Sequence, residues 1–320
     1  MTKTFDVRLD SFRSLNPKIQ NLTWVNALEF GGFDCSVDLE VSGKSYRGRG
    51  WAQDENLAFV KAVAEASERA ALGKSPFTSS WGMAAHTDKV LAIENAKREL
   101  FERDAFLCHY LSRTPFLADN SEKPKWFLQL RERLAHKNAE LVSFLLKSDF
   151  GVETSLVCVF GENYNKRFGG TLGLSCGLHY NDRLRSATCE ALRNFTAQEK
   201  SPTPSISLSD FLRLETVTPE HRQRLFLDLG FFREIEFIFL ESINELNDSP
   251  VLHTLDDQRW EIQELPDPTG IGFAIVRAFH PDLQGELKSL SNGLNTKRLS
   301  QFMSVTPTIE SLNPHPHILG

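Results

Sequence analysis

The chain has 320 residues, of which 41% are hydrophobic and 24% are charged, and its formal net charge is −6. This length and apolar content provide a sizeable core, in one large domain or two smaller ones. The negative charge argues against a nucleic acid as the main partner, because such partners call for an excess of Lys and Arg. No apolar run approaches the roughly 18 residues of a membrane span, so we also expect no membrane partner.

The five cysteines are scattered and odd in number, without a Cys-x-x-Cys pair. This pattern predicts reduced thiols, and we expect Cys35 and Cys158 to be buried because they lie in apolar, strand-like runs. The first eight residues contain no apolar segment of the kind found in signal peptides. Together these features predict a soluble, cytoplasmic protein.

The first half of the chain predicts one strand followed by three helices. Residues 33–41 alternate apolar and polar side chains, as half-buried strands do. A glycine-rich turn is expected next, at Gly43 and at Gly48-Arg49-Gly50. The three helices are expected to end at Gly73, before Pro115 and near His136. Their predicted ranges are 53–72, 88–111 and 123–136.

The second half predicts further strands and helices in no regular order. Strands are expected at 141–144, 155–160, 167–174, 234–239 and 271–279, and helices at 183–198, 209–214 and 219–229. Because no β-α-β cadence is visible, the predicted fold class is α+β, with mixed or antiparallel sheets packed with helices. We expect a single domain, 1–320, with an N-terminal strand region at 1–45 and an extended C-terminal tail at 305–320.

The most informative pattern is Glu-x-x-Glu-Arg, which occurs twice, each time inside a predicted helix. The first copy is Glu65–Arg69 and the second is Glu99–Arg103. Residues three apart share a helix face, so each copy places two carboxylates side by side. If the two helices face each other, four carboxylates converge and need cations. Divalent metal ions that carry nucleotide phosphates are the usual answer in an enzyme.

Other interpretations of these segments are structural or can be rejected. Glu65 with Arg69 and Glu99 with Arg103 could be simple i,i+4 ion pairs on solvated helix faces. A P-loop ending at Gly73-Lys-Ser is excluded, because Glu68 stands where its first glycine is needed. A di-iron site needs Glu-x-x-His, and both copies have Glu in place of His.

Five groups of segments are each weak evidence alone, but their order along the chain is specific. They are Gly48-Arg-Gly50 with Glu65–Arg69; Trp81–Ala85 with Glu99–Asp104; Leu172–His179 with Ala187–Leu192; Arg277–Pro281; and Pro314–Ile318. In this order they resemble the YcaO family of ATP-dependent enzymes that modify peptide backbones. The resemblance extends from Gly48 to the C-terminus. Pro314–Ile318 is similar to the Pro-x-Pro-x-Pro tail of azoline-forming members, with isoleucine in place of the last proline.

The resemblance implies a reaction and its cofactors, ATP and Mg2+. In the family, a Cys, Ser or Thr side chain of the peptide, or external sulfide, adds to a backbone amide carbon. The amide oxygen is then phosphorylated and expelled, which leaves an azoline or a thioamide. Paired glutamates hold the magnesium ions that bind the ATP phosphates. The metal ligands implied here are Glu65, Glu68, Glu99, Glu102 and Glu190, and the further nucleotide-binding residues are Lys61, Arg69, Arg103, Arg193 and Arg277.

The resemblance also gives the tail a role and the protein a set of partners. The family's C-terminus reaches the active site, so Pro314, His315, Pro316 and His317 are candidate catalytic residues. The histidines could shuttle protons, because histidine titrates near neutrality. The implied partners are a precursor peptide, an E1-like (ThiF-like) or TfuA-like protein that presents it, and a second copy of the chain in a homodimer. The Pro-x-Pro tail favours azoline over thioamide.

The chain departs from the family pattern at several positions around the nucleotide. Lys61 replaces a small residue, His86 a glycine, Arg193 a glutamine and Ser186 an arginine, for which Arg183 or Arg185 could substitute. These departures support an alternative function. The chain could be a catalytically degenerate homologue that binds a peptide or a partner protein as a scaffold.

Overall fold

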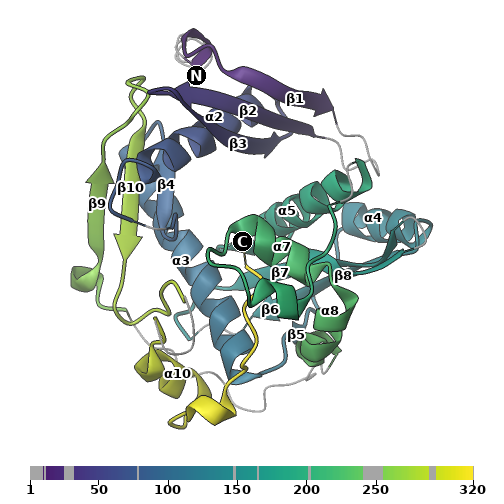
Figure 1. Ribbon diagram of the computed structural model, residues 1–320. Coiled ribbons are helices and arrows are strands. Elements are labelled where there is room, and N and C mark those ends of the chain that lie inside the picture. Colours follow the sequence, from purple (N-terminus) through teal and green to yellow (C-terminus); the bar gives the residue numbers. More distant parts are fainter. Residues whose placement is uncertain are drawn as a thin grey trace. The chain divides into compact units, whose positions relative to one another are not determined.

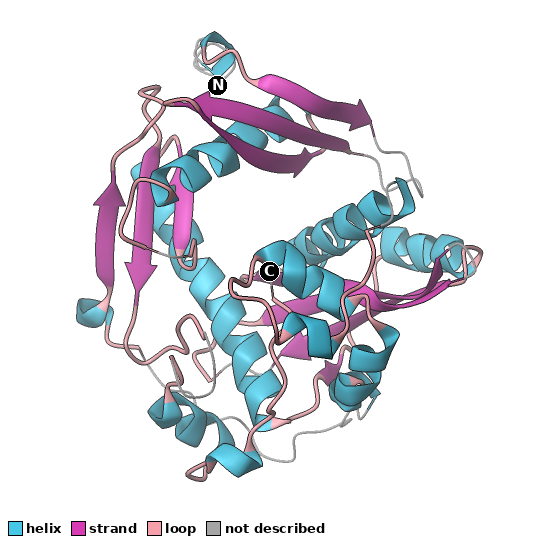
Figure 2. Ribbon diagram, viewed as in Figure 1, coloured by secondary structure: helices cyan, strands magenta, loops and turns pink. Residues whose placement is uncertain are grey.

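The computed structural model describes residues 10, 12–24, 32–77, 79–146, 149–163, 166–200, 203–240, 255–287 and 293–319. Helices and antiparallel strand pairs are interspersed along these residues, which confirms the predicted α+β class (Figures 1 and 2). The chain divides into two compact units. Unit 1 is Met1–Leu100 with Gln258–His280, and unit 2 is Phe101–Asp257 with Pro281–Gly320. The expectation of one domain stays a prediction.

Unit 1 contains two three-stranded sheets, in the orders β1-β2-β3 and β4-β10-β9. Helix α2 packs on β3 and β2 and also contacts β4. The strands are β1 (Lys18–Trp24), β2 (Phe33–Val41), β3 (Lys44–Ala52), β4 (Met83–His86), β9 (Glu261–Leu265) and β10 (Ala274–Phe279), and α2 is Glu55–Leu72. Asp54 caps α2 by accepting the backbone N–H of Leu57 at 2.8 Å. The strand predicted at 33–41 and the helix predicted at 53–72 are therefore confirmed.

The turn predicted at Gly48-Arg49-Gly50 is wrong, because these residues lie in the middle of β3. The turn is at Ser42 and Gly43, where both residues have positive φ. The buried face of α2 is lined with alanines, and a Cβ on Gly48 would lie only 2.0 Å from the carbonyl oxygen of Ala62. The glycines of β3 therefore allow α2 to pack closely against the strand, and they do not form a turn.

Unit 2 is built on a four-stranded sheet in the order β5-β6-β7-β8. Helix α5 packs on β8 and β7, α4 packs on β6, and α7 and α8 contact β8. The strands are β5 (Leu117–Ala118), β6 (Ala139–Leu146), β7 (Thr154–Asn163) and β8 (Lys166–Cys176). The helices are α4 (Lys125–Ala135), α5 (Tyr180–Lys200), α6 (Leu208–Phe211), α7 (Pro219–Phe226), α8 (Leu229–Ile235), α9 (Phe237–Leu240) and α10 (Thr296–Met303), with the 3-10 turn η3 (Ile309–Ser311). A further 3-10 turn, η2 (Asp257–Arg259), begins at the last residue before the chain returns to unit 1. Helix α3 (Lys89–Ser112) begins in unit 1 and continues into unit 2 from Phe101.

The strand predicted at 234–239 is also wrong, because this segment forms the end of α8 and the first three residues of α9. Asp228 starts α8 by accepting the N–H of Phe231 at 2.8 Å. Phe231, Ile235 and Ile238 are then buried at intervals of three to four residues, which is helical spacing. The short run of alternating residues within this pattern resembled a strand only over six positions.

A buried arginine joins α10 to the part of α3 in unit 2. The side chain of Arg298 is fully buried and donates to both carboxylate oxygens of Asp104 at 2.8–3.0 Å. Its third contact is with Asp149 at 2.7 Å. Two carboxylates therefore surround one guanidinium, which is the kind of pairing that a buried charge requires.

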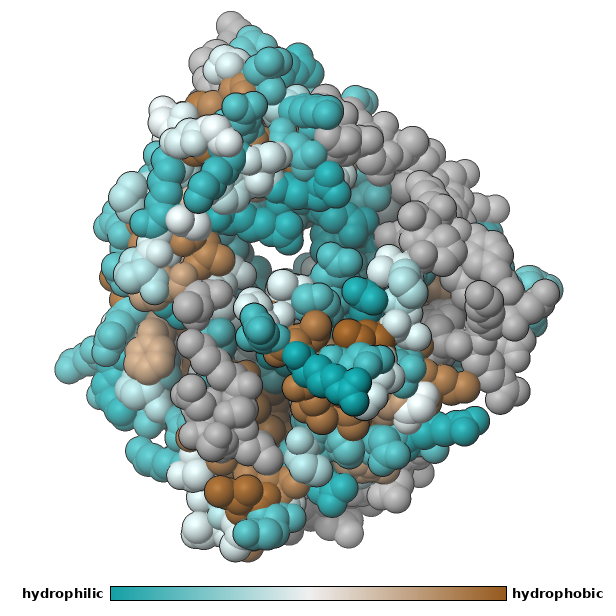
Figure 3. Space-filling model, in the orientation of Figure 1, coloured by the Kyte–Doolittle hydropathy of each residue, from teal (hydrophilic) through white to brown (hydrophobic). Residues whose placement is uncertain are grey.

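Each of the five cysteines is a free thiol, and four of them, including Cys35 and Cys158, are buried as predicted. Burial raises the pKa of Cys35 to about 11 and that of Cys158 well above its usual range, so neither is a reactive thiolate. On the face drawn in Figure 3, hydrophilic residues alternate with separate apolar patches. Among the described residues, every helix falls short of the length and apolar character that spanning a bilayer requires.

Candidate functional site

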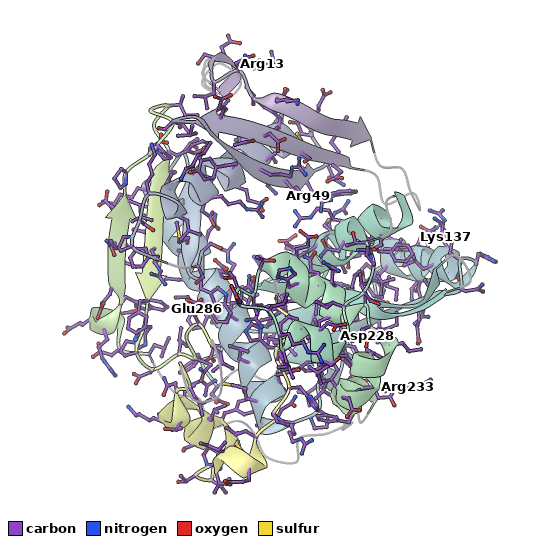
Figure 4. The ribbon with its side chains drawn as sticks, in the orientation of Figure 1. Arg13, Arg49, Lys137, Asp228, Arg233 and Glu286 are labelled. Atoms are coloured by element: carbon purple, nitrogen blue, oxygen red, sulfur yellow. The ribbon has the colours of Figure 1, made fainter. Side chains whose placement is uncertain are left out.

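Glu65 is fixed at the open edge of β3, the last strand of its sheet. The backbone N–H of Arg49, labelled on β3 in Figure 4, donates to Glu65 Oε2 at 2.8 Å. The other oxygen, Oε1, accepts from Arg69 at 2.6 Å, and Arg69 also donates to the carbonyl of Arg47 at 2.7 Å. One turn before Glu65, Lys61 Nζ donates to a carbonyl of the same strand at 3.3 Å. Charged groups of α2 therefore satisfy the exposed backbone edge of β3.

Glu68 lies among other carboxylates of unit 1. Desolvation raises the pKa of its carboxyl well above the usual range, and the negative charges of Glu99 and Glu65 raise it further. Arg69 and the backbone N–H of Ala85, in the edge strand β4, oppose this shift. Three carboxylates from α2 and α3, those of Glu65, Glu68 and Glu99, therefore interact in unit 1.

Two further glutamates meet at the open edge of β8 in unit 2. The N–H of Leu174 donates to Glu190 Oε2 at 3.0 Å, and the N–H of Cys176 donates to Glu102 Oε1 at 2.8 Å. Alternate residues of a strand point their N–H groups to the same side, and they are separated by about 7 Å. Glu102 from α3 and Glu190 from α5 are therefore neighbours along one strand edge.

Four of the five predicted metal ligands thus share one structural feature. Each places a carboxylate against a backbone N–H of a strand at the edge of its sheet. The pairs are Glu65 with Arg49, Glu68 with Ala85, Glu102 with Cys176 and Glu190 with Leu174. Charge-assisted hydrogen bonds of this kind fix the orientation of a carboxylate before any ligand binds. The sequence spacing alone did not reveal these backbone partners.

The donor chemistry of this set fits Mg2+ bound together with a nucleotide. Among the described residues, no three His, Cys, Asp or Glu side chains are grouped so that they could hold a metal ion by themselves. Mg2+ in nucleotide sites commonly uses one or two carboxylates and completes its shell with phosphate oxygens and water. Oxygen donors with an excess of negative charge meet that requirement. The five glutamates stay predicted, not demonstrated, ligands.

The predicted nucleotide-binding arginines lie in different surroundings. In unit 1, Arg277 of β10 donates to the carbonyl of Trp81 at 3.3 Å, and its guanidinium stacks 3.8 Å from the ring centre of Phe77. In unit 2, the Nε atom of Arg193 on α5 is buried, and no hydrogen-bond acceptor for it exists in the part of the chain that the structure describes. Arg103 contributes positive charge that lowers the pKa of Arg222 and of His317.

His86, at a position of departure from the family pattern, and the two possible substitute arginines have local contacts. His86 Nδ1 accepts the N–H of Asp88 at 2.9 Å, just before α3 begins. Arg183 donates to the carbonyl of Gly177 at 2.7 Å and also pairs with Glu153. The guanidinium of Arg185 lies 5.7 Å from the ring centre of Trp126. The position of the expected arginine, Ser186, is exposed at the surface of α5.

The C-terminal tail packs into unit 2. The N–H of Asn313 donates to the carbonyl of Leu111 at 2.8 Å, and the hydroxyl of Tyr110 donates to the carbonyl of Pro316 at 2.7 Å. The buried residues His317, Ile318 and Leu319 complete the contact. The tail is therefore part of the core of this unit.

The two tail histidines differ in exposure. Burial, together with the positive charges of Arg222 and Arg103, holds the pKa of His317 well below its usual range. The ring of His315 is only partly buried, and this burial lowers its pKa against the opposing charge of Glu234. Both rings are therefore neutral at pH 7. Of the two, His315 is more accessible to solvent, whereas Arg222 donates to the carbonyl of His317 at 2.9 Å. The catalytic role of Pro314–His317 stays a prediction.

Comparison with known proteins adds an independent line of evidence. A family model described as "YcaO cyclodehydratase, ATP- and Mg2+-binding" matches residues 54–287. This description names the two cofactors that the sequence predicts. A search of curated proteins gives no match.

Two solved structures are similar to most of the chain. One is a "heterocyclase in complex with substrate and cofactor", with a TM-score of 0.70 and 11% identity, which covers 98% of this chain. The chain spans 57% of the length of that heterocyclase. The other is a YcaO protein from Methanopyrus kandleri bound with AMPPCP and Mg2+, with a TM-score of 0.55 and 13% identity, which covers 87% of this chain and 89% of its own length. At these identities the similarity establishes the fold.

Proposed function

The chain belongs to the YcaO family, and from this premise we propose that it uses ATP and Mg2+ to activate a backbone amide of a peptide. Family membership gives the chain a cyclodehydratase-type role. One observation carries the finer proposal: four of the predicted magnesium ligands are held by backbone N–H groups at strand edges. Orienting carboxylates before binding is what a phosphoryl-transfer site requires, because its catalysis is mainly positioning and charge neutralisation.

The proposed reaction converts a peptide amide into an azoline. A thiol or hydroxyl of the peptide adds to the amide carbon, and the amide oxygen takes the γ-phosphoryl group of ATP, which leaves ADP. The C–O bond then breaks, phosphate departs with the former amide oxygen, and the nitrogen lone pair forms the C=N bond. The protons of the attacking group and of the amide nitrogen are released. With external sulfide as the nucleophile, the same activation gives a thioamide.

In this proposal, the glutamates hold the metal ions and the basic side chains bind the phosphates. Bound Mg2+ would neutralise charge on the phosphates and align them. Glu65, Glu68, Glu99, Glu102 and Glu190 would supply its carboxylate ligands. Lys61, Arg69, Arg103, Arg193 and Arg277 would supply positive charge toward the phosphates.

The tail would contribute groups near the reacting amide. His315 is the better candidate to move a proton, because it is partly exposed and neutral, whereas His317 is buried with a carbonyl contact to Leu287 at 3.3 Å. Pro314 and Pro316 would hold this segment extended. Removal of the whole tail would also remove core contacts, so His315→Gln is the sharper test of turnover. Product formation by this variant at the parental rate would refute the role.

The proposed substrate is a ribosomally made precursor peptide. An E1-like (ThiF-like) or TfuA-like partner would present it, and the chain would act as a homodimer. The heterocyclase with a similar fold is described in complex with substrate, which supports a peptide-processing role.

Titration calorimetry with a non-hydrolysable ATP analogue and Mg2+ tests the proposal. We expect micromolar binding that falls by about tenfold or more in Glu65→Gln and in Glu102→Gln. The matched control is Glu94→Gln, since Glu94 is exposed near the start of α3, and its affinity should be unchanged. A folded protein that binds no nucleotide at millimolar concentration would contradict the proposal.

That negative outcome would favour the second candidate function, a non-catalytic scaffold for a peptide or a partner protein. A specific observation favours it. Both oxygens of Glu65 already accept hydrogen bonds from the protein, one from Arg49 and one from Arg69. Pull-down of a precursor peptide by a protein that does not bind ATP would support the scaffold.

A further inference from the structure

Two parts of the chain repeat one strand–helix arrangement. We call them the β3–α2 motif (44–72) and the β8–α5 motif (166–200). In each, a glycine of the strand lets a helix approach closely. A Cβ on Gly48 would lie 2.0 Å from the carbonyl oxygen of Ala62, and a Cβ on Gly173 would lie 2.1 Å from that of Ala187. In both motifs the alanine follows the glycine by 14 residues.

The repeat extends to the functional glutamate. The residue after each glycine donates its backbone N–H to a glutamate 16 positions further along: Arg49 to Glu65 and Leu174 to Glu190. The distances are 2.8 and 3.0 Å. Glu65 and Glu190 are therefore equivalent residues of the two motifs, held in the same way.

The equivalence makes the next helical position informative. Three residues after the equivalent glutamates, the β3–α2 motif has Glu68 and the β8–α5 motif has Arg193. Both positions are one turn further along the same face of their helices. A carboxylate in one motif is thus replaced by a guanidinium in the other, which changes the local charge by two.

Arg193 is available for an anionic ligand. Its Nε–H is buried, and within the described ranges it has no acceptor. A guanidinium remains charged at all relevant pH values and binds phosphate in a planar, often bidentate geometry. A buried donor without an acceptor is unfavourable, so an incoming oxyanion would gain by supplying one.

We propose that Arg193 binds a phosphate oxygen of the nucleotide directly, at the position where the β3–α2 motif has the carboxylate of Glu68. The β8–α5 motif then contributes one metal ligand, Glu190, and one built-in cation, Arg193, whereas the β3–α2 motif carries two carboxylates, Glu65 and Glu68, at the equivalent positions. This inference rests on the proposed function. Two consequences follow. Part of the nucleotide affinity survives without divalent ions, and the chain binds fewer ions per nucleotide than a variant with glutamate at 193.

The test counts ions and measures affinity in the full chain, with Mn2+ as the probe and a non-hydrolysable ATP analogue. In EDTA, Arg193→Gln should bind the analogue about tenfold more weakly than the parent, and Arg193→Glu more weakly still. With excess Mn2+, electron paramagnetic resonance should count about one more ion per nucleotide in Arg193→Glu than in the parent. Arg131→Gln, at an exposed arginine of α4, is the matched control.

The possible outcomes distinguish failure of this inference from failure of the proposed function on which it rests. If the parent binds the analogue with Mn2+, but Arg193→Gln matches it in EDTA and Arg193→Glu gains no ion, the role of Arg193 is wrong and the proposed function stands. If the parent binds no analogue under any condition, both are wrong. Far-UV circular dichroism and thermal unfolding verify that each variant is folded. An equal loss in Arg131→Gln would also overturn the assignment, because the effect would then be one of net charge.

Discussion

The β3–α2 and β8–α5 motifs use the same backbone arrangement with different charges around it. In the first, one helix supplies Lys61, Glu65 and Arg69 to the edge of β3. In the second, two helices supply Glu102 and Glu190 to the edge of β8. The common part is the glycine, the alanine and the N–H-bound glutamate. The comparison shows that close strand–helix packing fixes the position of the carboxylate, while the charges of the flanking residues determine which ligand can bind beside it.

The largest effect should come from breaking the common part. Gly48→Ala and Gly173→Ala each place a Cβ about 2 Å from a helix carbonyl oxygen, so strand and helix must separate. We expect each to lower the free energy of unfolding by about 3 kcal/mol. Gly285→Ala is the control, because nothing lies within 4 Å of its Cβ, and it should change stability by less than about 0.5 kcal/mol. Urea unfolding measures all three, and a mild effect at Gly173 alone would break the equivalence.

A smaller effect, dependent on pH, should separate Glu68 from its counterpart Arg193. The raised pKa of the Glu68 carboxyl means that the folded chain holds this proton more tightly than the unfolded chain. Folding is therefore favoured by this group at low pH, and that advantage is lost as the pH rises through the raised pKa. Glu68→Gln should raise the free energy of unfolding at neutral pH and change it little near pH 4, where Glu68 is protonated.

Urea unfolding between about pH 4 and pH 8, without divalent ions, tests this difference. Arg193→Gln serves as the comparison, and its effect should not vary with pH, since a guanidinium does not titrate in this range. A Glu68→Gln variant that is less stable than the parent at pH 7 would show that Glu68 gains more from its contacts than it loses by repulsion.

The smallest effects should come from the flanking cations that only the β3–α2 motif has. Arg69→Ala removes an i,i+4 ion pair and a contact with a strand carbonyl, and Lys61→Ala removes a long hydrogen bond to the carbonyl of Trp51. Both side chains are exposed, so each change should cost less than about 1 kcal/mol in thermal or urea unfolding. A larger loss in Arg69→Ala would mean that the arginine, and not the backbone N–H, holds Glu65 in position.

Much of the fold was predictable because its helices carry local signals. The alanine and apolar spacing of α2, with Asp54 as its cap, is visible in the sequence, and α3 was predicted within one residue at each end. Strand β3 was not predicted, because Gly48 and Gly50 are required by the close packing of a helix, and this contact is not visible in the local sequence. The strand prediction at 234–239 failed for the opposite reason. Its polar and apolar residues alternate locally, but its buried residues follow the helical period of α8 and α9.

The candidate site was likewise predictable only in part from the sequence. The paired glutamates were found from their spacing, because a helix converts spacing into a shared face. Their backbone partners were not found, since an N–H donor leaves no mark in the residue type. The repeat was detectable in principle, as Gly48 and Gly173 precede Glu65 and Glu190 by the same 17 residues, but few other positions agree.

The buried contact of Arg298 with Asp104 and Asp149 has a consequence for biosynthesis. The two acids are translated long before their guanidinium partner emerges from the ribosome, and unit 1 likewise awaits residues 258–280. Neither unit can reach its final structure before these later residues have been synthesised. Expressing 1–257 alone should therefore yield material that chaperones retain or proteases degrade.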